Sequence, residues 1–333
     1  MKDSPVNKVV LSVQNLKTQF DTRAGTVTAV NDVSFNLGRG QILGLVGESG
    51  SGKSQTGYSI LNLVDPPGRI ASGRIVLNGQ DLGGLSEAQW RQIRGKRIAM
   101  IFQDPMLTLN PVLRIDTQMV EAVQAHRQVG RVQARQLARE ALVKVGIASP
   151  DERLAAYPHH FSGGMRQRVA IAIALLHDPE VIIADEPTTA LDVTIQEQIL
   201  AEMQQLTRTT GTALIWITHD LSVVAGLADY VAVMYAGRIV EYGPVQDIIE
   251  RPEHPYTVGL INSAPSRNRR GVPLHQIPGN TPHLAQLPAG CSFKPRCSRA
   301  RQECNELPAP SFHSPERVLR CFFPHEQPQK ELA

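Results

Sequence analysis

The chain has 333 residues, of which 42% are hydrophobic and 20% are charged, and its formal net charge is +3. This composition is ordinary for a globular protein. The charge is too small to indicate a nucleic-acid-binding protein, because the basic residues are spread along the chain. No apolar run approaches the roughly 18 residues that span a bilayer, and the first residues lack the apolar core of a signal peptide. We therefore expect a soluble cytoplasmic protein that reaches a membrane only through a partner.

The N-terminal part of the chain is predicted to be rich in β-strands. Segments 9–13, 26–30 and 33–37 are short and apolar, and the last two alternate in part with polar residues. That alternation is typical of an antiparallel sheet with one solvated face. Segment 73–79 predicts another short strand, closed by an Asn-Gly turn.

Segment 47–54 has the pattern Gly, four residues of any kind, then Gly-Lys-Ser, directly after an apolar strand at 42–46. Glycines let the backbone curl so that successive N–H groups point at phosphate oxygens. Lys53 would contact the β- and γ-phosphates, the Ser54 hydroxyl would bind Mg²⁺, and a helix beginning near Lys53 would add its positive dipole. A Gly/Ser-rich turn with a chance lysine is the alternative, and the preceding strand argues against it. The residues predicted to hold the nucleotide phosphates are Gly47, Glu48, Ser49, Gly50, Ser51, Gly52, Lys53 and Ser54.

Helices and buried strands alternate through the middle of the chain. Residues 115–146 carry apolar side chains near a 3.6-residue period, and further helices are predicted after Gly164 and Thr194. Continuous apolar strands are predicted at 181–184, 213–217 and 230–234. This alternation indicates an α/β fold with a parallel sheet covered on both faces.

Polar side chains that suit phosphoryl transfer follow three of the apolar strands. Asp185 and Glu186 lie at a strand tip, where ligands bind in such sheets. Asp185 is placed to hold Mg²⁺ through water, and Glu186 to orient and polarise the attacking water. An acid-rich helix N-terminus is the alternative reading. Gln103 could ligate Mg²⁺ and His219 could contact the γ-phosphate, although either residue alone is a weak signal.

The segment Phe161–Arg168 predicts a second anion-binding helix N-terminus. Ser162 is a good N-cap, and Gly163 and Gly164 allow close backbone approach at the start of an amphipathic helix. An ordinary capped helix would explain the same residues in isolation. One active site rarely needs two phosphate-binding segments so far apart in sequence.

Taken in order, these motifs resemble the ATPase subunits of ABC transporters across residues 8–250. The matching set is Gly47–Ser54, Gln103, Ser162–Gln167, Asp185–Glu186, Ala190–Asp192 and His219. The resemblance implies a P-loop NTPase fold with a parallel core sheet, an antiparallel β subdomain and a helical subdomain at about 104–160. It also implies a head-to-tail dimer in which Ser162, Gly163 and Gly164 of one subunit cap the ATP held by the other.

Three further positions can be compared with the family's pattern, of which one matches it and two depart from it. Phe20 matches the position of an aromatic residue that stacks on adenine. Met165 replaces a common glutamine of the signature segment, and Thr189 stands where serine often occurs. Neither departure removes a group that contacts phosphate.

Finer matches are similar to the oligopeptide/dipeptide permease ATPases, most nearly those of oligopeptide permeases. They lie at 47–56, 101–106, 234–238, 254–257 and 287–297. The resemblance implies a C-terminal region at 251–333 and an importer that takes up peptides. The implied partners are a second ATPase subunit, favoured to be a paralogue, two transmembrane permease subunits and an extracytoplasmic peptide-binding protein. It also implies a peripheral position at the cytoplasmic face of the inner membrane. Related branches carry nickel or other solutes.

A soluble ABC ATPase that acts on nucleic acid or ribosomes is the alternative function. Such proteins usually carry two nucleotide-binding units or long coiled coils, and the sequence indicates neither. Arginines spaced four apart at 127, 131, 135 and 139 are expected to form a solvated helix face, because no aromatic residues are interleaved. We therefore expect no nucleic-acid partner.

All four cysteines follow residue 290. Their spacing lacks two tight Cys-x-x-Cys pairs, and residue types alone leave zinc and an iron–sulfur cluster open. The permease resemblance implies a [4Fe–4S] cluster that ties down a proline-rich segment, with zinc as the alternative. The expected ligands are Cys291, Cys297, Cys304 and Cys321.

Overall fold

The computed structural model describes residues 8–189, 191–264, 275–314 and 316–325. The chain divides into two compact units, each built from several stretches of sequence. Predictions about the first residues and about Ala190 lie outside the described residues. The boundary near residue 250 stays a prediction. The first unit contains Met1–Leu11, Leu37–Gln41 and Leu82–Ile215, and the second contains Ser12–Asn36, Ile42–Asp81 and Trp216–Ala333.

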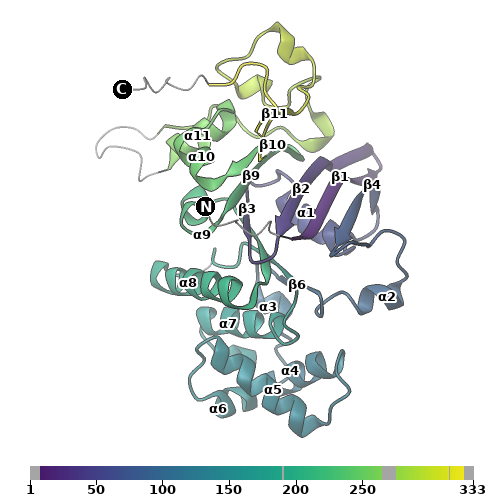
Figure 1. Cartoon of the computed structure of the whole chain (residues 1–333), viewed down its shortest axis with the longest axis vertical. Coiled ribbons are helices and arrows are strands. Elements are labelled where there is room, and N and C mark those ends of the chain that lie inside the picture. Colours follow the sequence, from purple (N-terminus) through teal and green to yellow (C-terminus); the bar gives the residue numbers. More distant parts are fainter. Residues whose placement is uncertain (1–7, 190, 265–274, 315, 326–333) are drawn as a thin grey trace, which may run out of the picture. The chain divides into compact units, whose positions relative to one another are not determined.

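The first unit holds most of the helices (Figure 1). Its strands β6 and β7 pair in parallel, with Ile98 opposite Val181 and Ile101 opposite Ala184. Every residue of β7 is buried, which confirms the predicted buried strand at 181–184. The elements are α2 (Glu87–Arg91), β6 (Ile98–Ile101), α3 (Pro105–Thr108), α4 (Ile115–Gln124), α5 (Arg131–Lys144), α6 (Pro150–Ala155), η1 (Pro158–His160), α7 (Gly163–Ala174), β7 (Val181–Asp185) and α8 (Val193–Thr210).

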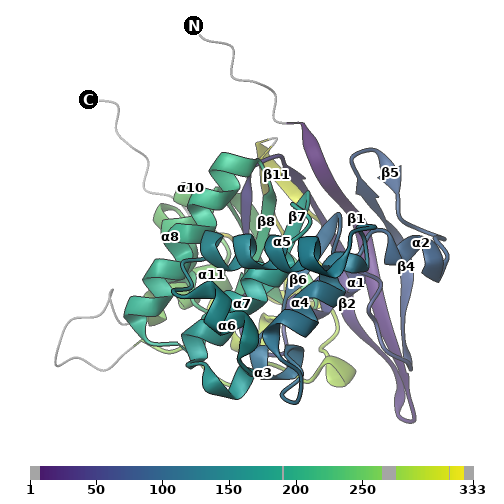
Figure 2. The same cartoon turned by 90° about the horizontal axis from the view of Figure 1, so that it is seen from below.

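Helices α4, α5, α6 and α7 gather into one bundle, which Figure 2 shows from below. The apolar positions predicted from the 3.6-residue period are buried, among them Met119 and Val123 of α4 and Ala138 and Leu142 of α5. Burial of one face of each helix supplies the stability that short helices lack in isolation. The region after Gln103 is therefore helical, as expected.

Three arginines of the predicted basic row form contacts within the protein. Arg135 and Arg139 of α5 both reach the carboxylate of Asp151, at 3.3 and 2.9 Å. The guanidinium of Arg127 donates to the carbonyl of Leu176 at 3.0 Å. These contacts join α5 to α6 and the segment after α4 to the segment after α7.

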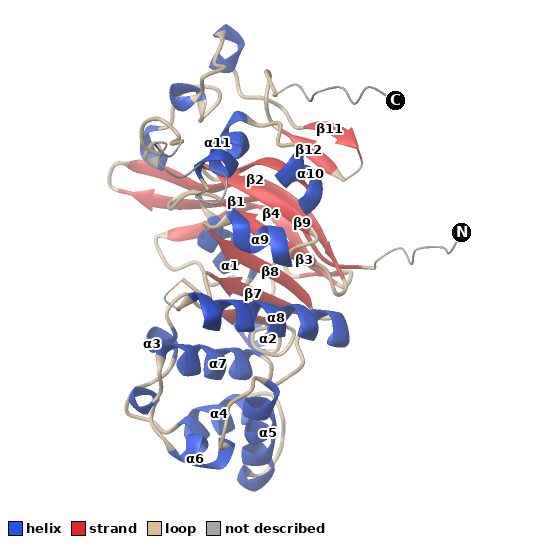
Figure 3. Cartoon of the chain, turned by 90° about the vertical axis from the view of Figure 1, so that its left-hand side faces the viewer, coloured by secondary structure: helices blue, strands red, loops and turns tan. Residues whose placement is uncertain are grey.

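The second unit is rich in strands (Figure 3). Strands β1, β2 and β8 also contribute a few residues to the first unit. The elements are β1 (Val9–Thr22), β2 (Gly25–Gly38), β3 (Ile42–Val46), α1 (Lys53–Ile60), β4 (Gly68–Leu77), β5 (Gln80–Asp81), β8 (Ala213–Thr218), α9 (Leu221–Leu227), β9 (Tyr230–Tyr235), β10 (Arg238–Pro244), α10 (Val245–Glu250), α11 (Pro255–Ser263), η3 (Leu284–Gln286), η4 (Lys294–Arg296), η5 (Gln302–Asn305), β11 (Ser311–Ser314) and β12 (Arg317–Leu319).

One sheet of the second unit has the strand order β11-β12-β10-β9-β3-β8. Strands β3 and β9 pair in parallel, with Leu43 opposite Tyr230, as the sequence predicts. Strands β10, β12 and β11 instead pair antiparallel. For β10 the reason is a two-residue turn after β9 at Ala236 and Gly237, with φ angles of 46° and 82°, because so short a turn can join only antiparallel strands.

The other sheet has the order β2-β1-β4-β5 and confirms an antiparallel β region. The predicted segments 26–30 and 33–37 form a single strand, β2. Asp32 lies between them with a φ of 60°, and its carboxylate accepts a hydrogen bond from the Asn15 amide at 2.8 Å. The predicted turn at Asn78 and Gly79 is confirmed, with φ angles of 46° and 83° between paired β4 and β5.

The longest helix described is α8, with 18 residues, and it buries few side chains. Within the described ranges, no helix combines the length and the apolar character that a bilayer crossing demands.

Close packing of α9 on β3 makes Gly44 a test of this core. A Cβ atom on Gly44 would lie 2.2 Å from Cγ1 of Val224. We expect Gly44→Ala to lower the free energy of unfolding by about 1–3 kcal/mol, the usual cost of overpacking, as measured by urea denaturation. Gly226→Ala is the control, because its Cβ would meet nothing within 4 Å. Equal stability of Gly44→Ala and wild type would contradict this packing.

Candidate functional site

The loop that carries the Gly-Lys-Ser pattern joins β3 to α1 in the second unit, and α1 begins at Lys53 as predicted. Two of its glycines have no room for a side chain. A Cβ atom on Gly47 would lie 2.2 Å from the carbonyl oxygen of Met234, and one on Gly52 would lie 2.4 Å from that of Ala29. Gly52 also has a φ of 100°, which disfavours any other residue. The curled backbone is therefore enforced by packing as well as by conformation.

Hydrogen bonds within the loop hold Lys53 at its centre. The buried ammonium group donates to the carbonyls of Gly47 at 2.8 Å and Glu48 at 3.0 Å. The Ser51 N–H donates to the Glu48 carbonyl at 3.2 Å, and the Ser51 carbonyl accepts from Gly237 at 2.9 Å. Ser51 Oγ is buried without a hydrogen-bond partner among the described residues. A tightly curled, glycine-rich loop at a helix N-terminus fits the binding of a nucleotide phosphate.

In the first unit, the carboxyl ends of β6 and β7 bring two predicted residues together. Asp185 is the last residue of β7 and is buried, and Glu186 follows it with a φ of 44°. The Glu186 carboxylate accepts hydrogen bonds from the Gln103 amide at 3.3 Å and from the Thr189 hydroxyl at 3.0 Å. Carboxylate and amide oxygens at one edge form a donor set suited to Mg²⁺.

The signature segment forms the N-terminus of α7. Ser162 is its N-cap, and Ser162 Oγ accepts a hydrogen bond from the Met165 N–H at 3.3 Å, which confirms the predicted capped helix. A Cβ atom on Gly164 would lie 2.8 Å from Cγ2 of Ile195 in α8. Asp192 caps α8 by accepting from the Ile195 N–H at 3.0 Å. Glycine at 164 therefore brings the starts of two capped helices into contact.

Two further predicted residues lie in the second unit. His219 is exposed, directly after β8. Phe20 lies inside β1 and not before the sheet, and its ring packs against Gly68, where a Cβ atom would lie 2.5 Å from Cε1. Thr18, on the same face of β1 as Phe20, shares a buried 2.7 Å hydrogen bond with Ser59 of α1. This face of β1 is thus directed towards the helix that follows the phosphate loop.

The predicted site residues are shared between the units. Phe20, the phosphate loop with Lys53 and Ser54, and His219 belong to the second unit. Gln103, Asp185, Glu186 and the segment beginning at Ser162 belong to the first.

Sequence reasoning missed the C-terminal residues that contact the phosphate loop. Arg296 forms an ion pair with Glu48 at 2.6 Å, and the Tyr256 hydroxyl accepts from the Glu48 N–H at 2.8 Å. The Glu48 side chain is therefore bound by protein groups. No spacing or periodicity in the sequence points to these contacts.

The four cysteines all line one cavity of about 10 Å³ in the second unit. Burial raises the pKa of the Cys291 and Cys297 thiols and raises that of Cys321 to about 11. Within the described part of the chain, no group of three or more His, Cys, Asp or Glu residues is arranged to hold a metal ion. The donors therefore converge as expected, but their packing leaves room for about one water molecule and not for a cluster.

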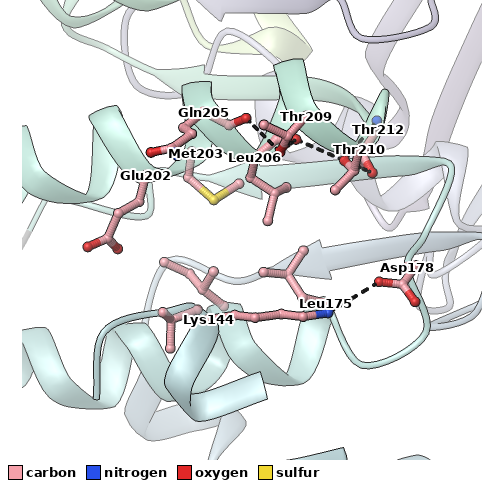
Figure 4. A pocket seen from close by; sticks show the side chains of 12 residues that line it. Lys144, Leu175, Asp178, Glu202, Met203, Gln205, Leu206, Thr209, Thr210 and Thr212 are labelled. Atoms are coloured by element: carbon pink, nitrogen blue, oxygen red, sulfur yellow. Dashed lines mark hydrogen bonds and ion pairs between the residues drawn. The ribbon is translucent and has the colours of Figure 1, made fainter. Parts of the chain in front are cut away.

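A separate cavity of about 330 Å³ lies in the first unit, between α8 and the helices α5 and α7 (Figure 4). Met203 and Leu206 face it from α8, and Leu175 faces it from beyond α7. Lys144 and Asp178 form an ion pair at its rim, at 3.7 Å. None of the predicted site residues lines this cavity.

Comparison with known families and proteins agrees with this geometry. Residues 30–189 match the family described as ABC transporter, and residues 240–304 match the family described as oligopeptide/dipeptide transporter, C-terminal region. The oligopeptide transport ATP-binding protein OppD of Salmonella typhimurium is 47% identical over 323 residues, which are 97% of this chain and 96% of that protein. The dipeptide transport ATP-binding protein DppD of Bacillus subtilis is 48% identical over 315 residues, 94% of each chain.

Among solved structures, the ATP-binding cassette MJ0796, a dimer in a post-hydrolysis state bound to ADP and Pi, is similar with a TM-score of 0.63. The two sequences are 25% identical, and the match covers 71% of this chain and 98% of that one. The similarity confirms the predicted α/β fold of the P-loop NTPase type.

Proposed function

This chain belongs to the ATP-binding subunits of ABC-type oligopeptide and dipeptide transporters, and we propose that it hydrolyses ATP to drive peptide import. The observation that carries this proposal is the preformed phosphate loop, with Lys53 buried and held by two loop carbonyls. Similarity over nearly the whole length of the oligopeptide and dipeptide proteins supports the peptide substrate class.

In the proposed mechanism, each residue of the site has one task. The loop amides and Lys53 bind the phosphates, and Ser54, Gln103 and Asp185 would hold Mg²⁺, which would supply positive charge against the phosphates. Glu186 orients the attacking water, and the hydrogen bonds from Gln103 and Thr189 fix its carboxylate. His219 contacts the γ-phosphate, and Phe20 stacks on adenine. The Thr18–Ser59 bond, which directs that face of β1 towards α1, supports the role of Phe20.

Completion of the site requires a second ATPase subunit. The residues Ser162, Gly163 and Gly164 form a capped helix N-terminus, which suits a phosphate. We infer that they cap ATP held by a partner subunit, favoured to be a paralogue. The dimeric state of the similar cassette MJ0796 supports this arrangement.

The membrane partners follow from the transporter family. Two transmembrane permease subunits would couple ATP binding to transport, and an extracytoplasmic peptide-binding protein would deliver the substrate. The chain would lie at the cytoplasmic face of the inner membrane as a peripheral subunit. Nickel or another solute is the alternative substrate.

We also propose that Cys291, Cys297, Cys304 and Cys321 bind a [4Fe–4S] cluster, with zinc as the alternative. Their convergence on one cavity supports a common ligand. Because the cavity is only about 10 Å³, the segments that carry the four cysteines must move apart before a cluster can bind. When bound, the metal centre would cross-link this loop-rich region.

Substitution of Glu186 tests the hydrolytic mechanism. We expect Glu186→Gln to retain ATP binding and to lower ATPase turnover on the order of 100-fold or more, because the amide cannot act as a base. The measurements are equilibrium ATP binding and phosphate release by the assembled transporter. Glu202→Gln is the matched control, because Glu202 pairs with Arg168 in the same unit and outside the proposed site. Normal turnover in Glu186→Gln would remove Glu186 from its role.

Copurification tests the assembly. We expect two permease subunits and a second ATPase subunit to accompany the full chain from native membranes, and added peptide-binding protein to stimulate ATP hydrolysis. Recovery of ribosomes, or salt-dependent binding to RNA, would favour the alternative nucleic-acid function.

Metal analysis tests the cysteine proposal. Anaerobically purified protein is expected to contain about four iron and four sulfide per chain and to lose both on Cys304→Ser substitution. Ser292→Ala, in the same segment, is the control that retains them. Because the ligands must be thiolates and burial raises the cysteine pKa values, loading should release protons and strengthen as pH rises. Zinc without sulfide would contradict the cluster.

A further inference from the structure

The Arg296 side chain connects the cysteine-bearing segment to the phosphate loop of the same chain. Its Nη1 donates to Glu48 Oε2 at 2.6 Å, and its Nη2 donates to Glu48 Oε1 at 3.0 Å. Its Nε donates to the carbonyl of Pro278 at 2.8 Å. Two parallel bonds to one carboxylate fix orientation as well as distance.

The arginine of this ion pair is buried, whereas the Glu48 side chain is 27% exposed. The Arg296 side chain is 5% exposed, and its guanidinium carbon lies 5.8 Å from the centre of the Tyr235 ring and 5.9 Å from that of Phe293. Burial opposes ionisation of Glu48, but the hydrogen bonds from Arg296 and Thr281 outweigh it, so the net effect lowers the pKa of Glu48. The pair is therefore charged at neutral pH, and loss of the Arg296 guanidinium leaves the partly exposed Glu48 carboxylate without its cation.

Glu48 is bound at two further points by residues that follow position 250. Its N–H donates to the Tyr256 hydroxyl at 2.8 Å, and its Oε2 accepts from the Thr281 hydroxyl at 2.5 Å. Both the backbone and the side chain of this loop residue are thus held from outside the loop.

Glu48 also accepts a hydrogen bond from Lys53, the lysine that is expected to contact the phosphates. The Glu48 carbonyl accepts from Lys53 Nζ at 3.0 Å, next to the Gly47 carbonyl at 2.8 Å. A change in the Glu48 backbone therefore moves an acceptor of Lys53. Displacements of about 1 Å are large for a site whose task is positioning.

Arg296 cannot move independently of the cysteine segment. It ends η4 and directly precedes Cys297, whose N–H donates to the Lys294 carbonyl at 3.2 Å. The Lys294 N–H in turn donates to the Cys291 carbonyl at 3.0 Å. A short hydrogen-bonded turn thus ties the backbone at Arg296 to both cysteines.

We propose that Arg296 is a positioning residue for ATP binding, which acts through Glu48 on the phosphate loop and Lys53. The inference rests on nucleotide binding at the loop, as proposed above. It makes the segment between Cys291 and Cys297 a functional extension of the nucleotide site in the same chain. A merely structural ion pair would stabilise the protein without affecting its affinity for ATP.

The test compares ATP affinity in purified full-length protein, measured by equilibrium binding, with thermal unfolding as a second readout. We expect Arg296→Met to weaken ATP binding about tenfold, within the usual range of coupling between sites. Arg296→Lys should recover part of the affinity. The double variant Glu48→Leu/Arg296→Met contains no unpaired charge and so remains folded even if the single variant does not. It should bind ATP as weakly as Arg296→Met.

Arg320→Met is the matched control. Arg320 is 11% exposed and pairs with Asp32 of β2 at 2.7 Å, so its loss removes a similar ion pair away from the phosphate loop. It should lower the unfolding temperature without changing ATP affinity. Wild-type affinity in the double variant, or equal losses in Arg296→Met and Arg320→Met, would overturn the inference. Failure of the wild-type protein itself to bind ATP would instead overturn the proposed function.

Discussion

The structure of the nucleotide site depends on one steric constraint, the close packing of the phosphate loop on the backbone of β2 and β9. A side chain on Gly47 would collide with the carbonyl of Met234, and one on Gly52 with that of Ala29. Because backbone lies on both sides, neither contact can be relieved by a rotamer change. The loop amides are thereby held in a curl before any ligand arrives, and this preorganisation is what phosphate binding requires.

The arrangement of the proposed catalytic residues Gln103 and Glu186 depends on parallel strand pairing. Strands β6 and β7 run in register and end together, so Gln103 reaches the carboxylate of Glu186 across a gap of 83 residues in sequence. The left-handed conformation of Glu186 turns the chain sharply after the buried Asp185. Together these features place an amide and two carboxylates at one edge of the sheet, and such a set of groups is suited to positioning Mg²⁺ and water.

Local interactions were predictable and longer-range ones were not. The start of α1 at Lys53, the Ser162 cap and the Asn78–Gly79 turn all depend on residues a few positions apart, and the sequence showed each of them. The antiparallel β10 was missed although its two-residue turn at Ala236 and Gly237 is local, because alanine does not signal a positive φ. The cysteines converge on one cavity as expected, but the cavity is smaller than the cluster that the resemblance implies.

The sequence by itself determined the family, the α/β fold and the identity of the phosphate loop. Glycine positions, apolar periodicity and polar residues at strand ends are enough to indicate them. Only the tertiary structure revealed that Arg296 binds Glu48, 248 residues earlier. An arginine carries no periodic signal, and its partner is decided by which buried carboxylate the folded chain places within hydrogen-bonding distance. The phosphate loop could be recognised from its own residues, but the C-terminal contacts that hold it could not.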